Sequence, residues 1–521
     1  STSFYNKYLD SKIPSRFFFY PNPYLLSPLL NHNDLLIKIS DKDAKNFWAN
    51  NLTRKGKNNV HNFLWLNLID RKNNAQTIQK IIADWIFKYQ DYKKDIWSNN
   101  LINLRVISWI SNADLIMNND KKEFKDSFLK NLIRQTNFIK KNIANISEGS
   151  RKISAISAII LSGLVFREYY NNYKIGLKEL KKLIEDFFDK NGVPKNRNFE
   201  NLVIFAQYFV LIKEWIKSGQ EDVPDYLEEI IEKNLICLNS LNNPSKKLPL
   251  FNGSTEKNLE NFFHYLTRLN YSLKKNLKSV AEIQIIKNKK STLYFDSGEP
   301  PIDKLSKDYQ SGPLSFEYSN DNHKIITNCG YGRKISKKIQ LLSKFTSAQS
   351  TLCINNTSVV KFKRNHVINK AYGSTINNSF KILDFDRTED KTNIIISATH
   401  DAYLGNFGYL HKRTIKFFKK NNDLIGNDNL IKKNGSSNID FCIRFHLYPG
   451  IDTVRTISGK SILLQINKNK SWIFSSENQK IGTEKSLFLG RNKALNNQCI
   501  VIYGNTKDED VNIEWKLKKA S

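Results

Sequence analysis

The sequence predicts an α+β multidomain protein, in which an N-terminal α/α toroid precedes an antiparallel β-sandwich. Apolar residues recur at three-to-four spacing in the first half, and in short β-branched runs in the second. The length of 521 residues exceeds what one hydrophobic core usually organises. Hydrophobic residues make up 40% of the chain, which is enough to fill two cores.

The first sixty residues are predicted to be an irregular arm. Pro14, Pro21, Pro23 and Pro28 interrupt any regular element there. We expect this arm, residues 1–60, to pack on the helices that follow.

Residues 61–280 are predicted to form the toroid. Residues 124–143 carry apolar side chains three and four apart with polar ones between them, which predicts an outer, half-solvated helix. Residues 153–166 and 202–215 are apolar on nearly every side and predict buried helices. Two kinds of helix favour the two layers of a toroid, although a plain bundle would give a similar pattern.

Residues 281–521 are predicted to form the sandwich. Val511, Ile513, Trp515 and Leu517 alternate with polar residues, as in a half-buried antiparallel strand. Further strands are predicted at residues 324–328, 393–398, 413–418, 441–448, 461–466 and 499–503. Many short strands joined by turns are typical of a sandwich.

The formal net charge is +31, with a pI near 9.6. Such an excess permits a polyanionic partner. The bias towards Lys, Asn and Ile expected of an AT-rich coding sequence explains the same charge, because the lysines are spread along the chain. Neither zinc-finger spacing nor an aromatic-interleaved basic strand is present, so we expect no nucleic-acid partner.

Five cysteines are scattered without any CxxC pair, which predicts buried free thiols. Cys329 and Cys353 could still meet across strands. No apolar run approaches the roughly 20 residues that span a bilayer, and the first residues show no signal peptide. Oligomeric state and compartment, cytoplasmic or periplasmic, stay open.

Seven short blocks in the second half resemble, in order and spacing, the C-terminal domain of the bacterial heparinase II/III family, particularly its alphaproteobacterial branch. The blocks are residues 295–301, 312–317, 325–330, 348–352, 400–403, 407–413 and 444–449. In the first half, the stretches at 97–109, 189–198 and 248–253 are similar to the same family. The resemblance implies a toroid followed by a sandwich. It also implies cleavage of uronic-acid polysaccharides by β-elimination, which needs a base, an acid and a group that neutralises the uronate carboxylate.

The sequence departs from the family pattern where histidines and an aspartate usually stand. Asp308 and Gln310 replace two histidines, Gln349 replaces a third, and Asn328 replaces the aspartate. Neutral amides are poor zinc ligands, so we predict that the family's zinc site is lost and that no cofactor is bound. Glutamine cannot shuttle a proton at neutral pH, so other groups are needed for catalysis.

The resemblance and the chemistry together nominate a set of candidate site residues. The catalytic candidates are Tyr309, Tyr403, Gln310 and His446. The substrate-binding candidates are Arg105, Arg197, Asn198, Asn252, Arg413 and Gln349. Arginine can clamp a carboxylate with two hydrogen bonds, but it also forms structural ion pairs. A lone histidine beside a strand is often structural as well.

Two functions follow from the resemblance. The first is a polysaccharide lyase, a carbon–oxygen lyase that acts on an acidic, uronic-acid-containing polysaccharide. The alternative is a catalytically degenerate relative that binds an anionic glycan or cell-envelope polymer without cleaving it. A structural protein without a ligand is a third reading.

Overall fold

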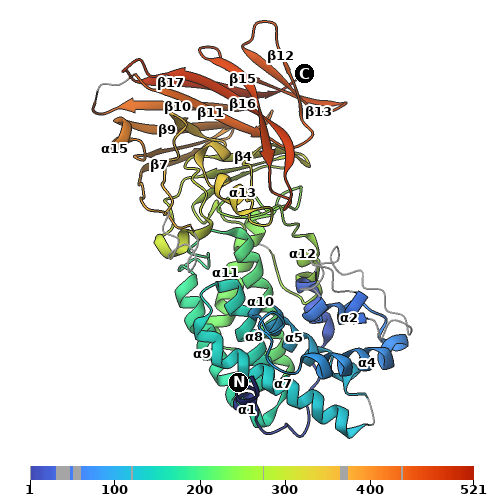
Figure 1. Ribbon diagram of the computed structural model, residues 1–521. Coiled ribbons are helices and arrows are strands. Elements are labelled where there is room, and N and C mark those ends of the chain that lie inside the picture. Colours follow the sequence, from blue (N-terminus) through green and yellow to red (C-terminus); the bar gives the residue numbers. More distant parts are fainter. Residues whose placement is uncertain are drawn as a thin grey trace. The chain divides into compact units, whose positions relative to one another are not determined.

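The computed structural model describes residues 2–30, 47–50, 60–118, 121–273, 275–363, 374–435 and 438–520. By their contacts, the residues divide into two compact units (Figure 1). The helical unit comprises residues 1–188, 203–233 and 261–271, and the β unit comprises residues 189–202, 234–260 and 272–521. Residues 189–202 and 234–260, which lie between parts of the helical unit in the sequence, therefore belong to the β unit. The domain boundaries after residues 60 and 280 stay predictions.

The described helices of the first half begin with two elements from the predicted arm. The α-helices are α1 (Thr2–Leu9), α2 (Phe47–Asn50), α4 (Arg71–Tyr89), α5 (Asn99–Ser111), α6 (Ala113–Ile116), α7 (Lys122–Asn142), α8 (Gly149–Val165), α9 (Tyr170–Phe187), α10 (Phe199–Ser218), α11 (Asp225–Leu241) and α12 (Glu260–Arg268). Short 3-10 turns are η1 (Pro23–Leu29), η3 (Leu64–Asn67), η4 (Ile143–Asn145) and η5 (Arg167–Tyr169). In the described part of the chain, no helix is long and apolar enough to cross a membrane.

Helix α8 is buried on nearly every side, as the sequence predicts. Residues 153–165 are all buried, and α8 packs against α5, α7 and α9. A Cβ atom on Gly163 would lie 2.1 Å from the backbone nitrogen of Tyr173, so only glycine permits this approach of α9. The prediction for residues 202–215 is confirmed in the same way by the burial of α10.

Two predictions for the helical unit need correction in part, since residues 124–127 and 140–142 of α7 are exposed or half-buried as predicted but its middle is not. Residues 131–139 of α7 are buried all round and not half-solvated. The N-terminal residues cover the outer face: Asn137 donates to the carbonyl of Leu9 at 2.9 Å, and Arg134 pairs with Asp10. The start of the predicted irregular arm is itself the helix α1, and residues 31–46 and 51–59 of the arm lie outside the described part.

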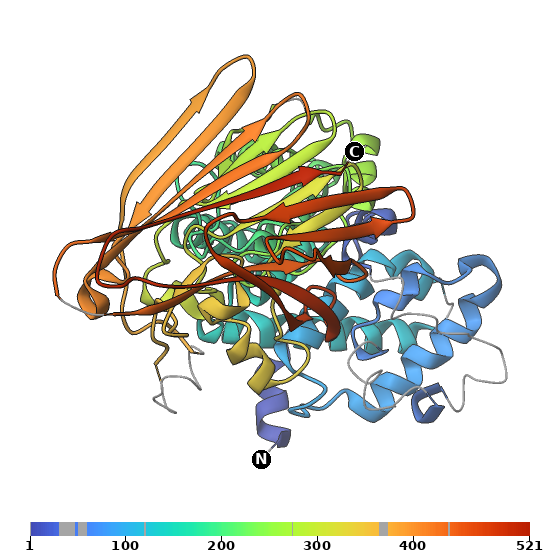
Figure 2. The ribbon, with the colours of Figure 1, turned by 90° about the horizontal axis from the view of Figure 1, so that it is seen from above.

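Within the described residues, the strands form a nine-stranded and an eight-stranded sheet with antiparallel pairing throughout (Figure 2). The nine-stranded sheet has the order β1-β2-β3-β4-β5-β11-β16-β15, and β6 also pairs with β11. Its strands are β1 (Ser279–Val280), β2 (Ile283–Lys287), β3 (Ser291–Asp296), β4 (Phe316–Asn320), β5 (His323–Thr327), β6 (Leu352–Ile354), β11 (Asp440–Leu447), β15 (Lys480–Phe488) and β16 (Leu495–Asn505).

The eight-stranded sheet has the order β12-β13-β14-β17-β10-β9-β8-β7. Its strands are β7 (Ile382–Glu389), β8 (Asn393–His400), β9 (Tyr409–Phe418), β10 (Leu424–Lys432), β12 (Asp452–Arg455), β13 (Ser461–Asn467), β14 (Lys470–Ser475) and β17 (Val511–Lys519). Short helices, η6 (Asp303–Asp308), α13 (Lys337–Leu342), η7 (Thr346–Ala348) and α15 (Leu404–Phe407), connect strands of the β unit.

One hydrophobic core joins the two sheets, so the β unit is a sandwich. The ring of Trp515 on β17 stacks on Phe316 of β4, with centroids 5.4 Å apart, and meets Phe445 of β11 edge-on. Ile513, Trp515 and Leu517 are buried, which confirms the alternation predicted for the last strand. The predicted fold class is therefore confirmed.

Candidate functional site

The amides that replace the family's histidines and aspartate lie together in the β unit. Gln310 is buried, and its Oε1 accepts a hydrogen bond from the Gly253 backbone at 3.0 Å. Its Nε2 donates to the carbonyls of Gly330 (3.1 Å) and Ser343 (2.8 Å). Gln349 donates to the same Ser343 carbonyl at 3.0 Å. The two glutamines therefore tie three loops of the unit together.

Asn328 has both ends of its amide engaged in the same way. Its Nδ2 donates to the Leu250 carbonyl at 3.1 Å, and its Oδ1 accepts from the Ser350 backbone at 2.9 Å. Among the described residues, no group of three or more His, Cys, Asp and Glu side chains is placed to hold a metal. The donor set around Gln310 is amides that already bond to protein groups, so it does not fit zinc. That the zinc site is lost stays a prediction.

Asp308 and Tyr309 precede Gln310 and lie in different surroundings. Asp308 accepts a hydrogen bond from the hydroxyl of Tyr331 at 3.1 Å and pairs with Arg333. Tyr309 is fully buried, and its hydroxyl has no hydrogen-bond partner among the described residues. Burial raises the pKa of Tyr309 above its usual range, and the nearby carboxylate of Asp296 adds to this effect. Tyr309 is therefore a neutral phenol at physiological pH.

The loops that carry Arg197, Asn198 and Asn252 pack on this cluster. Arg197 donates to the carbonyls of Ala281 (2.9 Å) and Glu299 (3.0 Å) and pairs with Asp296. Asn198 caps α10, since its Oδ1 accepts from the backbone nitrogen of residue 200 at 2.8 Å. Asn252 is buried with a positive φ of 50°. Its Nδ2 is unpartnered within the described part of the chain.

Arg413 belongs to a buried network inside the sandwich. Its guanidinium grips Asp428 with two hydrogen bonds of 2.7 and 3.0 Å. Asp428 also bonds to His411 Nε2 (2.7 Å) and to Trp515 Nε1 (2.9 Å), and His400 lies 3.1 Å from His411. Each of these side chains is fully buried, so the arrangement holds β8, β9, β10 and β17 together.

Tyr403 and Arg105 are also buried against protein groups. The Tyr403 hydroxyl donates to the Leu352 carbonyl at 2.8 Å, and burial raises its pKa well above the usual range. In the helical unit, Arg105 donates to the carbonyls of His61 (3.0 Å) and Ile96 (3.1 Å) and lies over the ring of Trp85. Desolvation lowers the pKa of Arg105 to about 9. Roles for Tyr403 and Arg105 in catalysis or binding stay predictions.

His446 does line a pocket, of about 340 Å³, on the nine-stranded sheet. Its Nε2 lies 3.0 Å from the Ser347 carbonyl, which can only accept, so Nε2 carries the proton. Nδ1 then accepts from the hydroxyl of Ser486 at 2.9 Å. Burial lowers the pKa of His446 to about 4, so the imidazole is neutral at pH 7.

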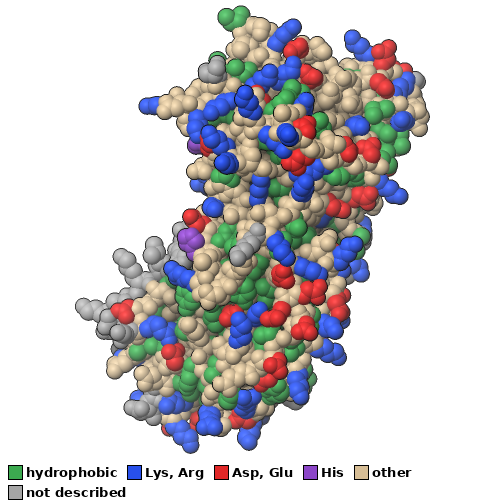
Figure 3. Space-filling view, turned by 180° about the vertical axis from the view of Figure 1, so that it is seen from behind, with side chains coloured by type: hydrophobic (Ala, Val, Ile, Leu, Met, Phe, Trp, Pro, Cys, Tyr) green, Lys and Arg blue, Asp and Glu red, His purple; other side chains and the backbone are tan. Residues whose placement is uncertain are grey.

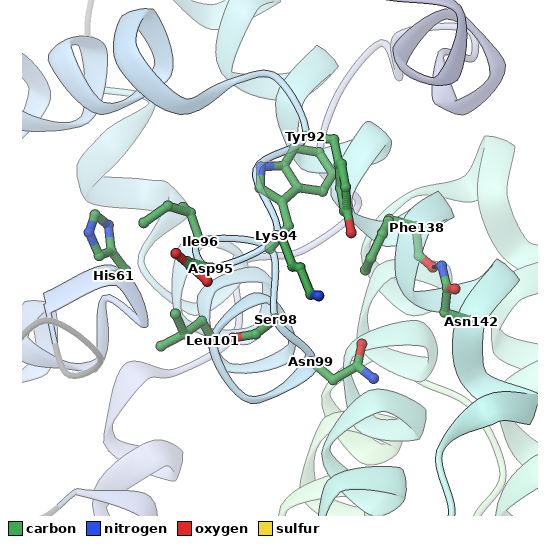
Figure 4. A pocket seen from close by; sticks show the side chains of 11 residues that line it. His61, Tyr92, Lys94, Asp95, Ile96, Ser98, Asn99, Leu101, Phe138 and Asn142 are labelled. Carbon is green, nitrogen blue, oxygen red and sulfur yellow. Dashed lines mark hydrogen bonds between the residues drawn. The ribbon is translucent and has the colours of Figure 1, made fainter. Parts of the chain in front are cut away.

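A pocket of about 590 Å³ opens in the helical unit (Figure 4). Tyr92, Trp97 and Phe138 form an aromatic group beside it, with Trp97 and Phe138 centroids 5.5 Å apart. Polar side chains at the pocket also include those of His61, Lys94, Asp95, Ser98, Asn99 and Asn142. Figure 4 shows Lys94, Asn99 and Asn142 extending towards the same opening.

The position of this pocket explains why sequence reasoning missed most of it. The loop between α4 and α5 carries residues 92–98, and α7 carries the two residues 138 and 142. Of the set, the sequence pointed only to Trp97, through its likeness to a family helix. A lysine and two asparagines in an asparagine-rich chain carry no local signal.

Comparisons with known proteins agree with the fold. Residues 276–516 match the family model described as "Heparinase II/III-like, C-terminal". A mutant of heparan sulfate lyase HepC from Pedobacter heparinus is similar in structure, with a TM-score of 0.72 and 12% identity, over 100% of this chain and 88% of that one. A structure of heparinase III is similar with a TM-score of 0.69 and 13% identity, over 100% and 89%.

A curated sequence also matches. FtsZ-localized protein C of Caulobacter vibrioides is 23% identical over 238 residues, which are 43% of this chain. The match spans 40% of that protein, so the chain covers less than half the length of this curated relative.

Proposed function

We propose that the protein uses the fold of residues 276–516, which match the heparinase II/III-like C-terminal family model, to bind an acidic polysaccharide without cleaving it. The observation that carries the proposal is the state of Gln310, Gln349 and Asn328. They stand where the resemblance implies proton-transfer and metal-binding groups, and all three amides bond to protein groups. β-Elimination needs a group that accepts the C5 proton, which an amide does not do.

The tyrosines that remain nearby do not replace the missing base. A phenol acts as a base only where its pKa is brought down towards neutrality. Burial has the opposite effect on Tyr309 and Tyr403, since it raises the pKa of both. Neither hydroxyl is exposed to a ligand in solution.

The pocket of the helical unit supports the binding half of the proposal. The exposed ammonium of Lys94 suits the carboxylate of a sugar acid, and the half-buried ring of Tyr92 suits an apolar face of the sugar, with the buried Trp97 and Phe138 packed beside it. Figure 3 shows Lys and Arg side chains spread over the face in view, with Asp and Glu between them. The net charge of +31 favours the approach of any polyanion, whereas the pocket supplies the selective contacts.

The test combines turnover and binding on the same preparation. The full chain is incubated with a panel of uronate polysaccharides while absorbance is followed at about 232 nm, where the unsaturated product of β-elimination absorbs. Binding is measured by titration calorimetry with size-defined oligosaccharides of the same panel. We expect binding without product. A product that accumulates with enzyme concentration would establish the lyase instead, and His446 would then be the base to replace first.

A matched pair of variants ties binding to the pocket. Lys94→Ala removes the ammonium at the rim, and Lys181→Ala removes an exposed lysine of α9 that does not line the pocket. We expect the first to weaken binding about ten-fold and the second to leave it unchanged. Equal loss in both variants would mean that net charge alone attracts the polymer. No binding by the parent chain to any glycan would exclude the proposal.

The match to FtsZ-localized protein C favours a second candidate, association with FtsZ. Co-sedimentation of the chain with FtsZ polymers tests it directly. Pelleting that depends on polymerised FtsZ would support this candidate, and an unchanged soluble fraction would remove it.

A further inference from the structure

Two cysteines face each other on neighbouring strands of the nine-stranded sheet. Cys353 on β6 and Cys442 on β11 are direct partners in the antiparallel register. Phe441, Ile443 and Phe445 point into the sandwich core, so the alternation of β11 places Cys442 on the other face. There it forms a small buried cluster with Cys353 and Cys499.

Directly opposed residues in an antiparallel pair have Cα atoms roughly 4.5–5.5 Å apart. A disulfide requires a Cα separation of about 4.4–6.8 Å, so the backbone already meets this requirement. The Cβ atoms of such a pair lie about 4.5–5.5 Å apart, slightly beyond the usual disulfide value, so a small closing movement completes the bond. β6 is three residues long and, among the described strands, pairs with β11, so the closing movement involves one short strand.

The surroundings make the two thiols unequal. Arg444 Nη1 lies 3.0 Å from the Cys442 sulfur. The neighbouring Cys353 thiol, whose sulfur also donates to the Thr357 carbonyl at 3.2 Å, and the Arg444 guanidinium hold the pKa of Cys442 below its usual value, against the effect of burial. The same contact raises the pKa of Cys353. The guanidinium beside its sulfur makes Cys442 the more readily ionised thiol of the pair.

Cys353 and Cys442 are buried and do not line the 340 Å³ pocket, but two neighbours of Cys442 lie closer to solvent. Arg444 lines the 340 Å³ pocket and lies beside the Cys442 sulfur. Tyr503, the register partner of Cys442 on β16, is 39% exposed, and Cys442 itself is 6% exposed. Burial raises the pKa of Cys237 and of Cys329 to about 12 in both cases, and that of Cys499 well above its usual value, so none of these is a ready thiolate.

We propose that Cys353 and Cys442 are a dithiol site for thiol–disulfide exchange, in which Cys442 attacks and Cys353 resolves. The Cys442 thiolate attacks one sulfur of a low-molecular-weight disulfide such as oxidised glutathione and releases one glutathione thiolate. Cys353 loses its proton to that thiolate and attacks the Cys442 sulfur, which expels the second glutathione. The second glutathione thiolate takes from solvent the proton that Cys442 released on ionisation. The protein dithiol thus loses two protons and two electrons, and one oxidised glutathione becomes two reduced molecules.

Intact mass spectrometry of the full chain tests this exchange. The reduced protein is mixed with oxidised glutathione, and free thiols are then blocked in acid. We expect the unblocked mass to fall by about 2 Da, with a Cys353–Cys442 link in the peptide map. Cys353→Ser should accumulate one glutathione on Cys442, Cys442→Ser should form neither product, and the control Cys237→Ser should close like the parent.

A second measurement needs no variant. The parent chain is treated briefly with a limiting amount of iodoacetamide, and its peptides are mapped. We expect Cys442 to be alkylated before the other four cysteines. Preferential labelling elsewhere, an unchanged mass with oxidised glutathione, a bridge between other cysteines, or a glutathione adduct that persists on Cys442 of the parent would each overturn the proposal.

Discussion

The loops around Gln310 and the pocket around Lys94 differ in what surrounds their polar side chains. At Gln310 every amide atom meets a protein group, and the neighbouring loops close on it: a Cβ at Gly253 would lie 2.7 Å from Asp308 Cβ. Around Lys94 the polar side chains border about 590 Å³ of open space. The amides around Gln310 are thus paired within the protein, whereas the polar side chains around Lys94 border open space, and the motif residues Arg444 and His446 line a separate pocket of about 340 Å³. The family resemblance predicted the fold of the β unit, whereas the contacts show which polar side chains are already hydrogen-bonded within the protein.

The largest expected effect is a loss of stability when the buried network of Arg413 is broken. This experiment tests whether Arg413 has a structural role. Asp428→Ala leaves the Arg413 charge buried without a partner, and we expect it to lower the free energy of unfolding by about 3–5 kcal/mol. Urea titration monitored by tryptophan fluorescence measures the change. The exposed Lys485→Ala serves as the control, and a loss below about 1 kcal/mol would contradict the structural role.

The next effect concerns pH. In the folded chain the pKa of His446 is lowered to about 4, whereas an unfolded histidine titrates near about 6.5. The unfolded state therefore binds the proton first as pH falls. Stability from this group is complete above about pH 6.5 and is lost progressively down to about pH 4, by roughly 3 kcal/mol.

The control for this pH dependence is His446→Gln, which has no titrating group at position 446. Urea unfolding of both proteins is measured at intervals from pH 7 to pH 4. We expect the difference in stability between the parent and the variant to shrink as pH falls. A constant difference across this range would show that His446 titrates alike in both states.

A smaller loss is expected at Gln310. Gln310→Ala leaves the Gly253 nitrogen and the Gly330 carbonyl without the partner that Gln310 supplies, while the Ser343 carbonyl keeps Gln349, and we expect a loss of about 1–3 kcal/mol in stability. Glycan affinity should stay unchanged, since the residue does not face a ligand. Calorimetry measures the affinity of this variant for the glycan, and circular dichroism shows whether it is folded. If the folded variant binds the glycan more weakly than the parent, the loops around Gln310 contact the ligand after all.

The smallest effect tests the pocket. Asn99→Ala removes one amide from its rim, and we expect glycan affinity to fall about five-fold, or about 1 kcal/mol, at unchanged stability. Asn145→Ala, an exposed asparagine outside the pocket, is the matched control. If both variants bind like the parent, the ligand does not contact Asn99.

Much of the fold could be predicted, because it depends on local periodicity. Alternation at residues 511–517 identified β17, and continuous apolar character at 153–166 identified the buried α8. The prediction failed at α7, where polar residues suggested a solvated face. Those side chains instead bond to the N-terminal segment, more than a hundred residues away in sequence.

Less of the site could be predicted. Arg413 was a reasonable carboxylate clamp from sequence, since nothing local shows that Asp428 occupies it from the adjacent strand. His446, which lies in one of the predicted motifs, does line a pocket. The lysine and asparagines of the pocket in the helical unit lie in no motif, because they come from a loop and from helices that are distant in sequence. A thiol pair across strands was foreseen for Cys329 and Cys353, whereas the register sets Cys353 against Cys442.

By itself, the sequence determined that a helical first half precedes a β-rich second half. It also determined the family resemblance of the second half and the amides at positions where that resemblance implies ionisable groups. These properties follow from side-chain type and spacing, which the chain carries locally. Only the tertiary structure decided which polar groups are already paired, which thiols face each other and where open space remains. Each of those depends on hydrogen bonds and packing between segments far apart in sequence, and burial then shifts the pKa of enclosed groups such as Tyr309 and His446.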